Sequence, residues 1–218
     1  MHRSGTSWLA GSLQQQGLEL GTVNVEAAHN QKGNRENDEL AALHGAVLQS
    51  SGGAWDAPPE RVEWSDAHRA ALAAFIGRMC ASSPLWGFKD PRTLLVLDEW
   101  HRQVPQLERV GIFRHPGAVV RSLAARSPVS ERVGLRLWRA YNERLVAEHR
   151  RLPFPIVRFD DPDALPRAVE VVARHLALPG ARDPGTFFDS DLVRQRITET
   201  GVPRSCRSAW DYLVANAV

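Results

Sequence analysis

Short apolar segments alternate with helical patterns through the second half of the chain, and this alternation limits the fold more than any other feature. The short apolar segments are 85–88, 109–113 and 154–159. Helical patterns cover 93–102, 116–126, 131–150 and 163–176. Strands separated by helices pair in parallel, and their apolar character indicates burial on both faces. The sequence therefore predicts an α/β fold with a mainly parallel sheet flanked by helices.

The first half of the chain is predicted to be helical with irregular connections. Helices are expected over 9–16, 37–49 and 67–81, and loops over 22–35 and 55–64. A length of 218 residues fits one domain, 1–218, with a core of about 1–178. The segment 179–218 is less regular, with short helices expected over 190–196 and 208–216.

Composition and charge exclude several classes of protein. No stretch of 18 apolar residues is present, which predicts no membrane span, and the N-terminus has no apolar signal region. The two cysteines favour a cytoplasmic location without disulfides. A net charge of +2 gives no support for a nucleic-acid partner. Because Lys32 and Lys89 are the only lysines among 27 basic residues, a lysine within a dense motif is informative.

The first such motif opens the chain as Arg3-Ser4-Gly5-Thr6-Ser7, followed by Trp8 and a predicted helix. Glycine permits a tight turn, hydroxyl groups and Arg3 supply donors, and a helix N-terminus favours anions. These residues predict an anion-binding loop, although the same composition is typical of a simple turn and helix cap. The Walker A pattern is absent, which argues against a kinase or NTPase of that type.

A second motif follows the predicted strand 109–113. Arg114 stands at its carboxyl end, where open α/β sheets bind ligands, and Pro116 suits the start of a helix. Ser122 and Arg126 are four residues apart and are expected on one face of that helix. The three polar residues fit a second phosphate site, and a solvated arginine face is the alternative.

A third motif, Lys89-Asp90-Pro91-Arg92, follows the predicted strand 85–88. Lys89 is placed where chemistry tends to occur in such folds. Asp90 is expected to pair with Lys89 or Arg92, an arrangement that also suits a purely structural role.

Together the three motifs resemble those of sulfotransferases that use 3′-phosphoadenosine 5′-phosphosulfate (PAPS). Arg3–Ser7 is similar to the family's R-[SA]-G-T-[TS] loop, and Arg114 with Ser122 keeps the family's eight-residue spacing. Arg126 and Lys89-Asp90-Pro91 resemble the tyrosylprotein-type branch. The stretch 29–37 is similar to the N-x-x-G-x-x-E-N segment of bacterial sulfotransferase-like proteins. The resemblance covers about residues 1–160 and fades after 179, where the family's R-K-G motif is missing.

The resemblance implies a P-loop-like three-layer sandwich and a donor site for PAPS, with no metal. The implied donor-site residues are Arg3, Ser4, Gly5, Thr6, Ser7, Trp8, Arg114, Ser122 and Arg126. Lys89 is implied to act on the sulfuryl group, and an acceptor hydroxyl or amine needs a general base. Glu36 is our first choice for that base, with His29 and Asp90 as alternatives, and His115 is expected only to begin a helix. Glu36 also fits a structural role, in which it favours the first turn of the following helix.

The acceptor is left open by the sequence, as is the oligomeric state. A small molecule, a carbohydrate or another hydroxyl-bearing acceptor fits these residues. Trp138, Tyr141 and Asn142 have helical spacing that suits either an acceptor pocket or the core. A sulfotransferase-like module that binds a nucleotide without catalysis is the main alternative function, and a small-molecule kinase is a weaker one.

The position of the opening loop leads to one more expectation. A phosphate loop of this kind follows a buried strand, yet only two residues precede Arg3. We therefore expect that the first strand is missing from the chain as given, through an internal start or as a fragment. Restoring about ten upstream residues, the upper end of usual strand lengths, should raise both stability and donor affinity.

Overall fold

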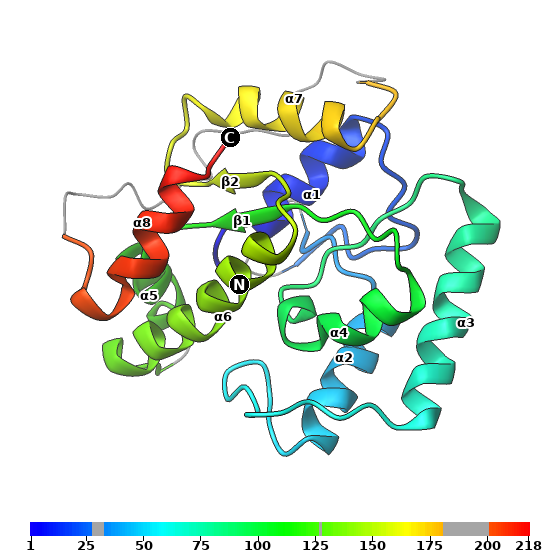
Figure 1. The fold of residues 1–218 in the computed structure, drawn as a ribbon, viewed down its shortest axis with the longest axis horizontal. Helices are drawn as coiled ribbons and strands as arrows, with labels where there is room; N and C mark the ends of the chain where they lie inside the picture. The colour runs from blue at the N-terminus through cyan, green and yellow to red at the C-terminus, as the bar shows by residue number, and fades with distance from the viewer. Residues whose placement is uncertain (28–32, 127, 181–200) are drawn as a thin grey trace.

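A small parallel sheet lies at the centre of the molecule, whose structure is a computed structural model (Figure 1). Strand β1 (Gly111–Phe113) pairs in parallel with β2 (Ile156–Arg158), and Ile112 lies opposite Val157. The structure describes residues 1–27, 33–126, 128–180 and 201–218. Within these residues the chain is a mixed, helix-rich α/β structure with two named strands, so the α/β prediction is confirmed.

Helices cover both faces of this sheet (Figure 1). One face carries α1 (Thr6–Gln15) and α7 (Leu165–His175). The other face carries α4 (Thr93–Gln103), α6 (Glu131–Arg151) and α8 (Arg207–Ala215), with the 3₁₀ turn η2 (Arg204–Cys206) before α8.

The two faces of the strands belong to two separate hydrophobic clusters. Ile112 and Val157 pack with Leu9 and other apolar residues of α1 and α7. Phe113 and Ile156 belong instead to a larger cluster that includes residues of α4, α6 and α8. Burial of alternate strand residues on opposite faces explains why the strands read as continuous apolar runs in the sequence.

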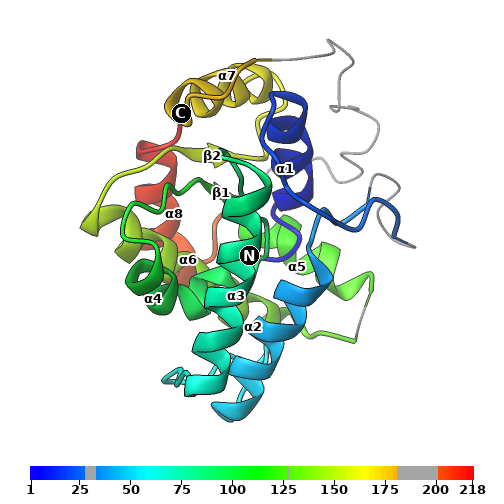
Figure 2. The ribbon, with the colours of Figure 1, turned by 90° about the vertical axis from the view of Figure 1, so that its right-hand side faces the viewer.

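Two further helices, α2 (Asp38–Ser50) and α3 (Asp66–Ser82), pack against each other beside the sheet (Figure 2). Each begins at a polar cap that the sequence contains: Asn37 accepts from the amide of Leu40, and Ser65 accepts from the amide of His68. α5 (Pro116–Ala124) follows β1 and packs on α6. Its proline occupies the first turn, as expected from the sequence.

The predicted helices of the described residues are all present, with ends shifted by a few residues. α1 begins at Thr6, three residues earlier than expected, because the turn at Gly5 leads directly into the helix. α5 ends at Ala124, so Arg126 lies in the turn that closes the helix and not within the helix itself. The helix expected over 190–196 lies outside the described residues.

The strand predicted over 85–88 is wrong for the described chain. This segment forms one isolated parallel bridge, between Trp86 and Glu19, in place of a strand. The apolar pattern was sufficient to predict an extended segment. A strand also needs a continuous hydrogen-bonded neighbour, and Gly87 donates only to the carbonyl of Glu19 at 2.9 Å.

Candidate functional site

The opening loop turns sharply into the N-terminus of α1. Gly5, the residue before the helix, has φ 88°, and Arg3 has φ 65°. A β-carbon at Gly5 would lie 2.3 Å from the Phe159 ring, so the position requires glycine for both its dihedral angle and its space. No side chain of the described residues caps α1, and the helix therefore presents its N-terminal amides and positive dipole end at this loop.

Ser4 lies fully buried in the same loop. Its hydroxyl oxygen has no hydrogen-bond partner among the described residues. A buried hydroxyl without a partner costs free energy, and a ligand atom within the loop would satisfy it. Thr6 and Ser7, the first two residues of α1, are half-buried and complete the set of hydroxyl groups.

A hydrogen bond joins this loop to the second motif. Arg3 Nε donates to Ser122 Oγ at 2.7 Å, although the two residues are 119 positions apart in the chain. Ser122 is buried on α5. The structure therefore brings together the opening loop and α5, the helix after β1. These are the two segments for which the sequence predicted anion-binding residues.

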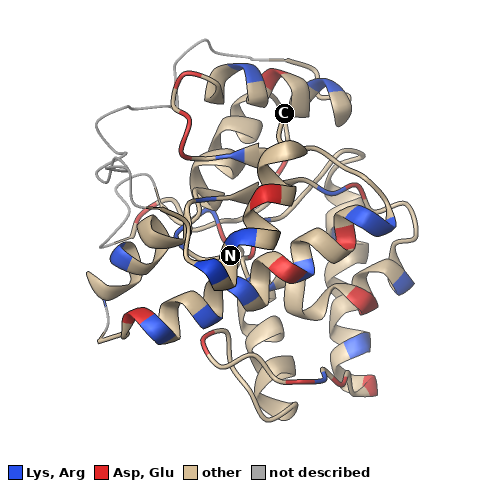
Figure 3. Cartoon of the chain, turned by 60° about the vertical axis from the view of Figure 1, so that its left-hand side comes forward, with Lys and Arg blue, Asp and Glu red and all other residues tan. Residues whose placement is uncertain are grey.

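Three arginine side chains share this place. Burial, together with the charges of Arg126 and Arg114, lowers the pKa of Arg3 to about 10. Arg114 Nη1 also donates to the carbonyl oxygen of Arg3 at 3.5 Å. Ribbon segments with basic residues lie close to the N-terminus in Figure 3. Like charges gathered at a half-buried site favour an anion, because an anion offsets their mutual repulsion and accepts their hydrogen bonds.

Arg114 follows β1 directly, as predicted, and pairs with a carboxylate. Its Nε lies 3.4 Å from Asp160 Oδ1, and its guanidinium lies 5.3 Å from the centre of the Phe159 ring. Asp160 also accepts from the amide of His115. Burial lowers the pKa of Arg114 and raises that of Asp160. Asp160 follows β2, so the carboxyl ends of both strands contribute to the site.

The third motif joins Glu36 rather than the arginine cluster. Lys89 Nζ donates to Glu36 Oε1 at 2.6 Å, and Arg92 Nη2 lies 3.6 Å from Glu36 Oε2. Burial lowers the pKa of Lys89, although the charge of Glu36 and the hydrogen bond to it act to raise that pKa. Glu36, our first choice for the base, and Lys89, implied to act on the sulfuryl group, are therefore in contact although 53 positions separate them in the chain.

Asp90 holds Arg92, the second cation beside Glu36. It pairs with Arg92 at 2.8 Å and with His44 Nδ1 at 2.8 Å, and His44 Nε2 accepts from Trp100 Nε1 at 3.0 Å. Although burial raises the pKa of Asp90, the His44 and Arg92 contacts outweigh it and hold the pKa far below its usual range. The expected pairing of Asp90 with Arg92 is confirmed. Asp90 is buried and held by Arg92 and His44, which gives it a structural position rather than that of a base.

His44 is the residue of this site that sequence reasoning missed. It is fully buried on α2 between Leu40 and Val47, on the helix's apolar stripe. The sequence does contain one signal for it, a single histidine on an otherwise apolar helix stripe, which indicates a buried histidine with a polar partner. Its partner cannot be read from spacing, because Asp90 lies 46 residues further along.

The beginning of the loop lies between the two clusters. The His2 ring packs on Trp55, with the ring centres 4.4 Å apart. Burial lowers the pKa of His2 to about 3, and the charges of Asp90, Arg92 and Lys89 also act on it. The arginine cluster and the Lys89–Glu36 pair are therefore connected through the residues that begin the loop.

Several residues singled out in the sequence have other roles or lie outside the described residues. Trp138, Tyr141 and Asn142 are buried and belong to the core: Trp138 donates to the carbonyl of Arg114, and Tyr141 donates to that of Trp55. His115 caps α5, as expected. His29 lies outside the described residues, and so does part of the 29–37 stretch.

No group of His, Cys, Asp and Glu residues in the described chain is arranged to hold a metal ion. No helix in that part of the chain is long and apolar enough to cross a membrane. Comparisons with protein-family models, curated proteins and solved structures find no significant match for this chain. The function must therefore be argued from the geometry of the site.

Proposed function

We propose that this protein is a PAPS-dependent sulfotransferase, which moves a sulfuryl group from the donor to a hydroxyl or amine acceptor. The observation that carries the proposal is the 2.7 Å hydrogen bond between Arg3 and Ser122, with Arg114 and Arg126 near enough to lower the pKa of Arg3. A helix N-terminus with hydroxyl groups and a cluster of arginines at one site suits a ligand with two phosphate groups. PAPS has its 3′-phosphate and its 5′-phosphosulfate at the two ends of one adenosine.

In this proposal the loop, residues 3–8, holds the 5′-phosphosulfate through Arg3, hydroxyl groups and helix amides. Arg114, Ser122 and Arg126 hold the 3′-phosphate and so orient the donor. The sheet with helices on both faces supports a P-loop-like sandwich as the framework of this site.

Transfer forms a bond between the acceptor oxygen or nitrogen and sulfur, while the bond from sulfur to the 5′-phosphate oxygen breaks. The departing oxygen stays on adenosine 3′,5′-bisphosphate. Lys89 and Arg3 stabilise charge on the equatorial sulfuryl oxygens and on the departing phosphate. Glu36 accepts the proton of the acceptor, and Arg92 orients its carboxylate.

A radiolabelled transfer assay tests the proposal. Purified protein is incubated with ³⁵S-labelled PAPS and a panel of phenols, sugars, hydroxylated lipids and amines, and with γ-labelled ATP as an alternative donor. We expect label transfer from PAPS to at least one acceptor class and none from ATP. Transfer from ATP alone would identify a small-molecule kinase and reject the proposal.

A non-catalytic module that binds the nucleotide is the second candidate function. One observation favours it: Glu36 is held by two cations, Lys89 and Arg92, which compete with an acceptor for its carboxylate. Tight binding of adenosine 3′,5′-bisphosphate, together with no transfer to any acceptor of the panel, would establish this function instead.

A further inference from the structure

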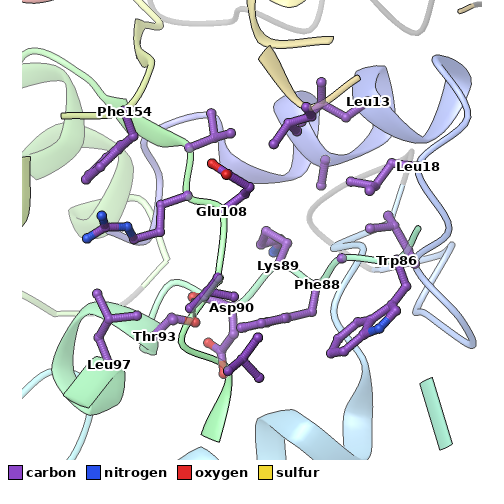
Figure 4. A pocket seen from close by; sticks show the side chains of 18 of the residues that line it. Leu13, Leu18, Trp86, Phe88, Lys89, Asp90, Thr93, Leu97, Glu108 and Phe154 are labelled. Atoms are coloured by element: carbon purple, nitrogen blue, oxygen red, sulfur yellow. Dashed lines mark hydrogen bonds between the residues drawn. The ribbon is translucent and has the colours of Figure 1, made fainter. Parts of the chain in front are cut away.

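A cavity with a volume of about 590 Å³ lies between β1 and the segment 85–90. Figure 4 shows Leu13 and Leu18 on one side of it, Phe154 and Leu97 on another, and Phe88 and Trp86 on a third. Leu13 belongs to the cluster on the α1 face of the sheet, whereas Leu97 and Phe154 belong to the cluster on the opposite face. The cavity therefore lies between the two apolar clusters that cover the faces of the sheet, and the charged residues Lys89, Asp90 and Glu108 also line it.

One edge of the cavity is the open side of β1. Gly111 donates to Pro155 at 2.9 Å, and the carbonyl of Phe113 accepts from Phe159 at 2.9 Å, so both residues face β2. In a parallel pair the residue between them directs its N–H and C=O to the other side. That residue is Ile112, which lines the cavity and has no backbone partner among the described residues.

The opposite edge of the cavity, the segment 86–88, also has backbone groups that face the cavity. Gly87 donates to Glu19 at 2.9 Å, and the Trp86–Glu19 bridge is parallel. Trp86 and Phe88 flank Gly87, so their backbone groups face away from Glu19. Both residues line the cavity, and neither has a backbone partner in the described chain.

We propose that this cavity is a docking groove for a β-strand: an extended apolar peptide that pairs with Ile112 on one side and with Trp86 and Phe88 on the other. Every named pairing of the described sheet is parallel, and the occupant continues that pattern. Apolar walls on both faces select a strand that is apolar at consecutive positions, as in buried parallel sheets. Unmatched backbone groups at both edges favour a peptide over an apolar small molecule, which leaves them unsatisfied. Thr6 and Lys89 of the proposed donor and catalytic site also line the cavity. The inference itself rests on the open strand edges and not on the proposed function.

Amide hydrogen exchange of the full chain, measured by NMR, tests the groove. The probe is a capped peptide of five consecutive valine and isoleucine residues followed by lysines for solubility. Its control carries proline at alternate apolar positions, which removes backbone donors. We expect the first peptide to slow exchange at Ile112, Trp86 and Phe88 by about tenfold or more, and the proline peptide to have no effect.

The variant Ala10→Trp provides a second test, because Ala10 lines the cavity from α1 and a large side chain there fills it. The variant should retain the wild-type circular dichroism and lose protection by the peptide. Equal protection by both peptides, no protection by either, or protection by a fatty acid such as laurate in place of the peptide would each overturn the proposal. The comparison of the two peptides on the wild-type chain stands even if the variant does not fold.

Discussion

Glu36 lies 2.6 Å from Lys89 and is the side chain to which the proposal assigns proton transfer. Glu36→Gln keeps the shape of the side chain and removes the proton acceptor. We expect kcat to fall by about 10²–10⁴-fold, the usual contribution of a general base, while the affinity for adenosine 3′,5′-bisphosphate stays within about twofold. Steady-state kinetics and titration calorimetry measure the two quantities.

The matched control for this change is Glu39→Gln, three residues along, where Glu39 pairs with Arg78 at the surface. It should retain wild-type kinetics. A kcat of Glu36→Gln close to that of the control would remove Glu36 from the mechanism.

Asp90 makes the folding stability of the protein depend on pH. Its pKa is lowered in the folded chain, so its stabilising effect is complete above the unfolded value of about 4. The effect is lost as the pH falls from about 4 toward the folded pKa. Asp90→Asn removes it, and we expect a loss on the order of 2 kcal/mol at pH 7, since bonds to charged groups are involved.

Urea denaturation at several pH values measures this effect. The difference between wild type and Asp90→Asn should be constant from about pH 7 to 5 and shrink below about pH 4. Asp98→Asn, at an exposed position of α4, is the control and should change little. A difference that is the same at pH 3 and pH 7 would contradict the assignment.

At the scale of elements, the junction between the loop and α1 depends on Gly5. Gly5→Ala combines a positive φ with a β-carbon 2.3 Å from Phe159, whereas Gly52 has φ 76° and no atom within 4 Å of the position that a β-carbon would take. Gly52→Ala therefore measures the dihedral cost alone, about 1–2 kcal/mol. We expect Gly5→Ala to lose clearly more stability in urea denaturation and to bind adenosine 3′,5′-bisphosphate more weakly. Equal losses in the two variants would show that the contact with Phe159 has no consequence.

Elements with a local signal were the ones that the sequence could predict. Asn37, Ser65 and Pro116 each mark the start of a helix, and each helix begins there or at the next residue. The segment 85–88 had a strand-like composition but only a single bridge to Glu19. Whether an apolar run becomes a strand depends on the neighbour it pairs with, and that neighbour is not encoded in the run itself.

In the candidate site, too, residues with a local sequence signal could be predicted and contacts between distant segments could not. Gly5 and Arg114 lie where local patterns placed them, before a helix and after a strand. The pairing of Glu36 with Lys89 and that of His44 with Asp90 join segments 53 and 46 residues apart. Spacing along the chain contains no information on such contacts, because they depend on how α2 packs against the segment after Trp86.

For the whole molecule, the central feature is that the opening loop and α5 meet although 119 residues separate Arg3 from Ser122. The sheet makes this possible, because β1 ends directly before Arg114 and Ser122 follows on α5, so both motifs lie at the carboxyl end of the strands. Asp160, after β2, fixes Arg114 in the same region. The two motifs are therefore expected to act on one ligand with two phosphate groups.

Titration calorimetry with adenosine 3′,5′-bisphosphate and with AMP, which lacks the 3′-phosphate, tests this requirement most directly. Wild type should bind the bisphosphate at least about tenfold more tightly, and Ser122→Ala should narrow that ratio, because a hydrogen bond to a charged group contributes about 1.5–3 kcal/mol. Arg139→Ala, at an exposed ion pair on α6, should leave the ratio unchanged. Equal affinity of the wild type for both nucleotides, or a ratio that Ser122→Ala does not alter, would contradict the account.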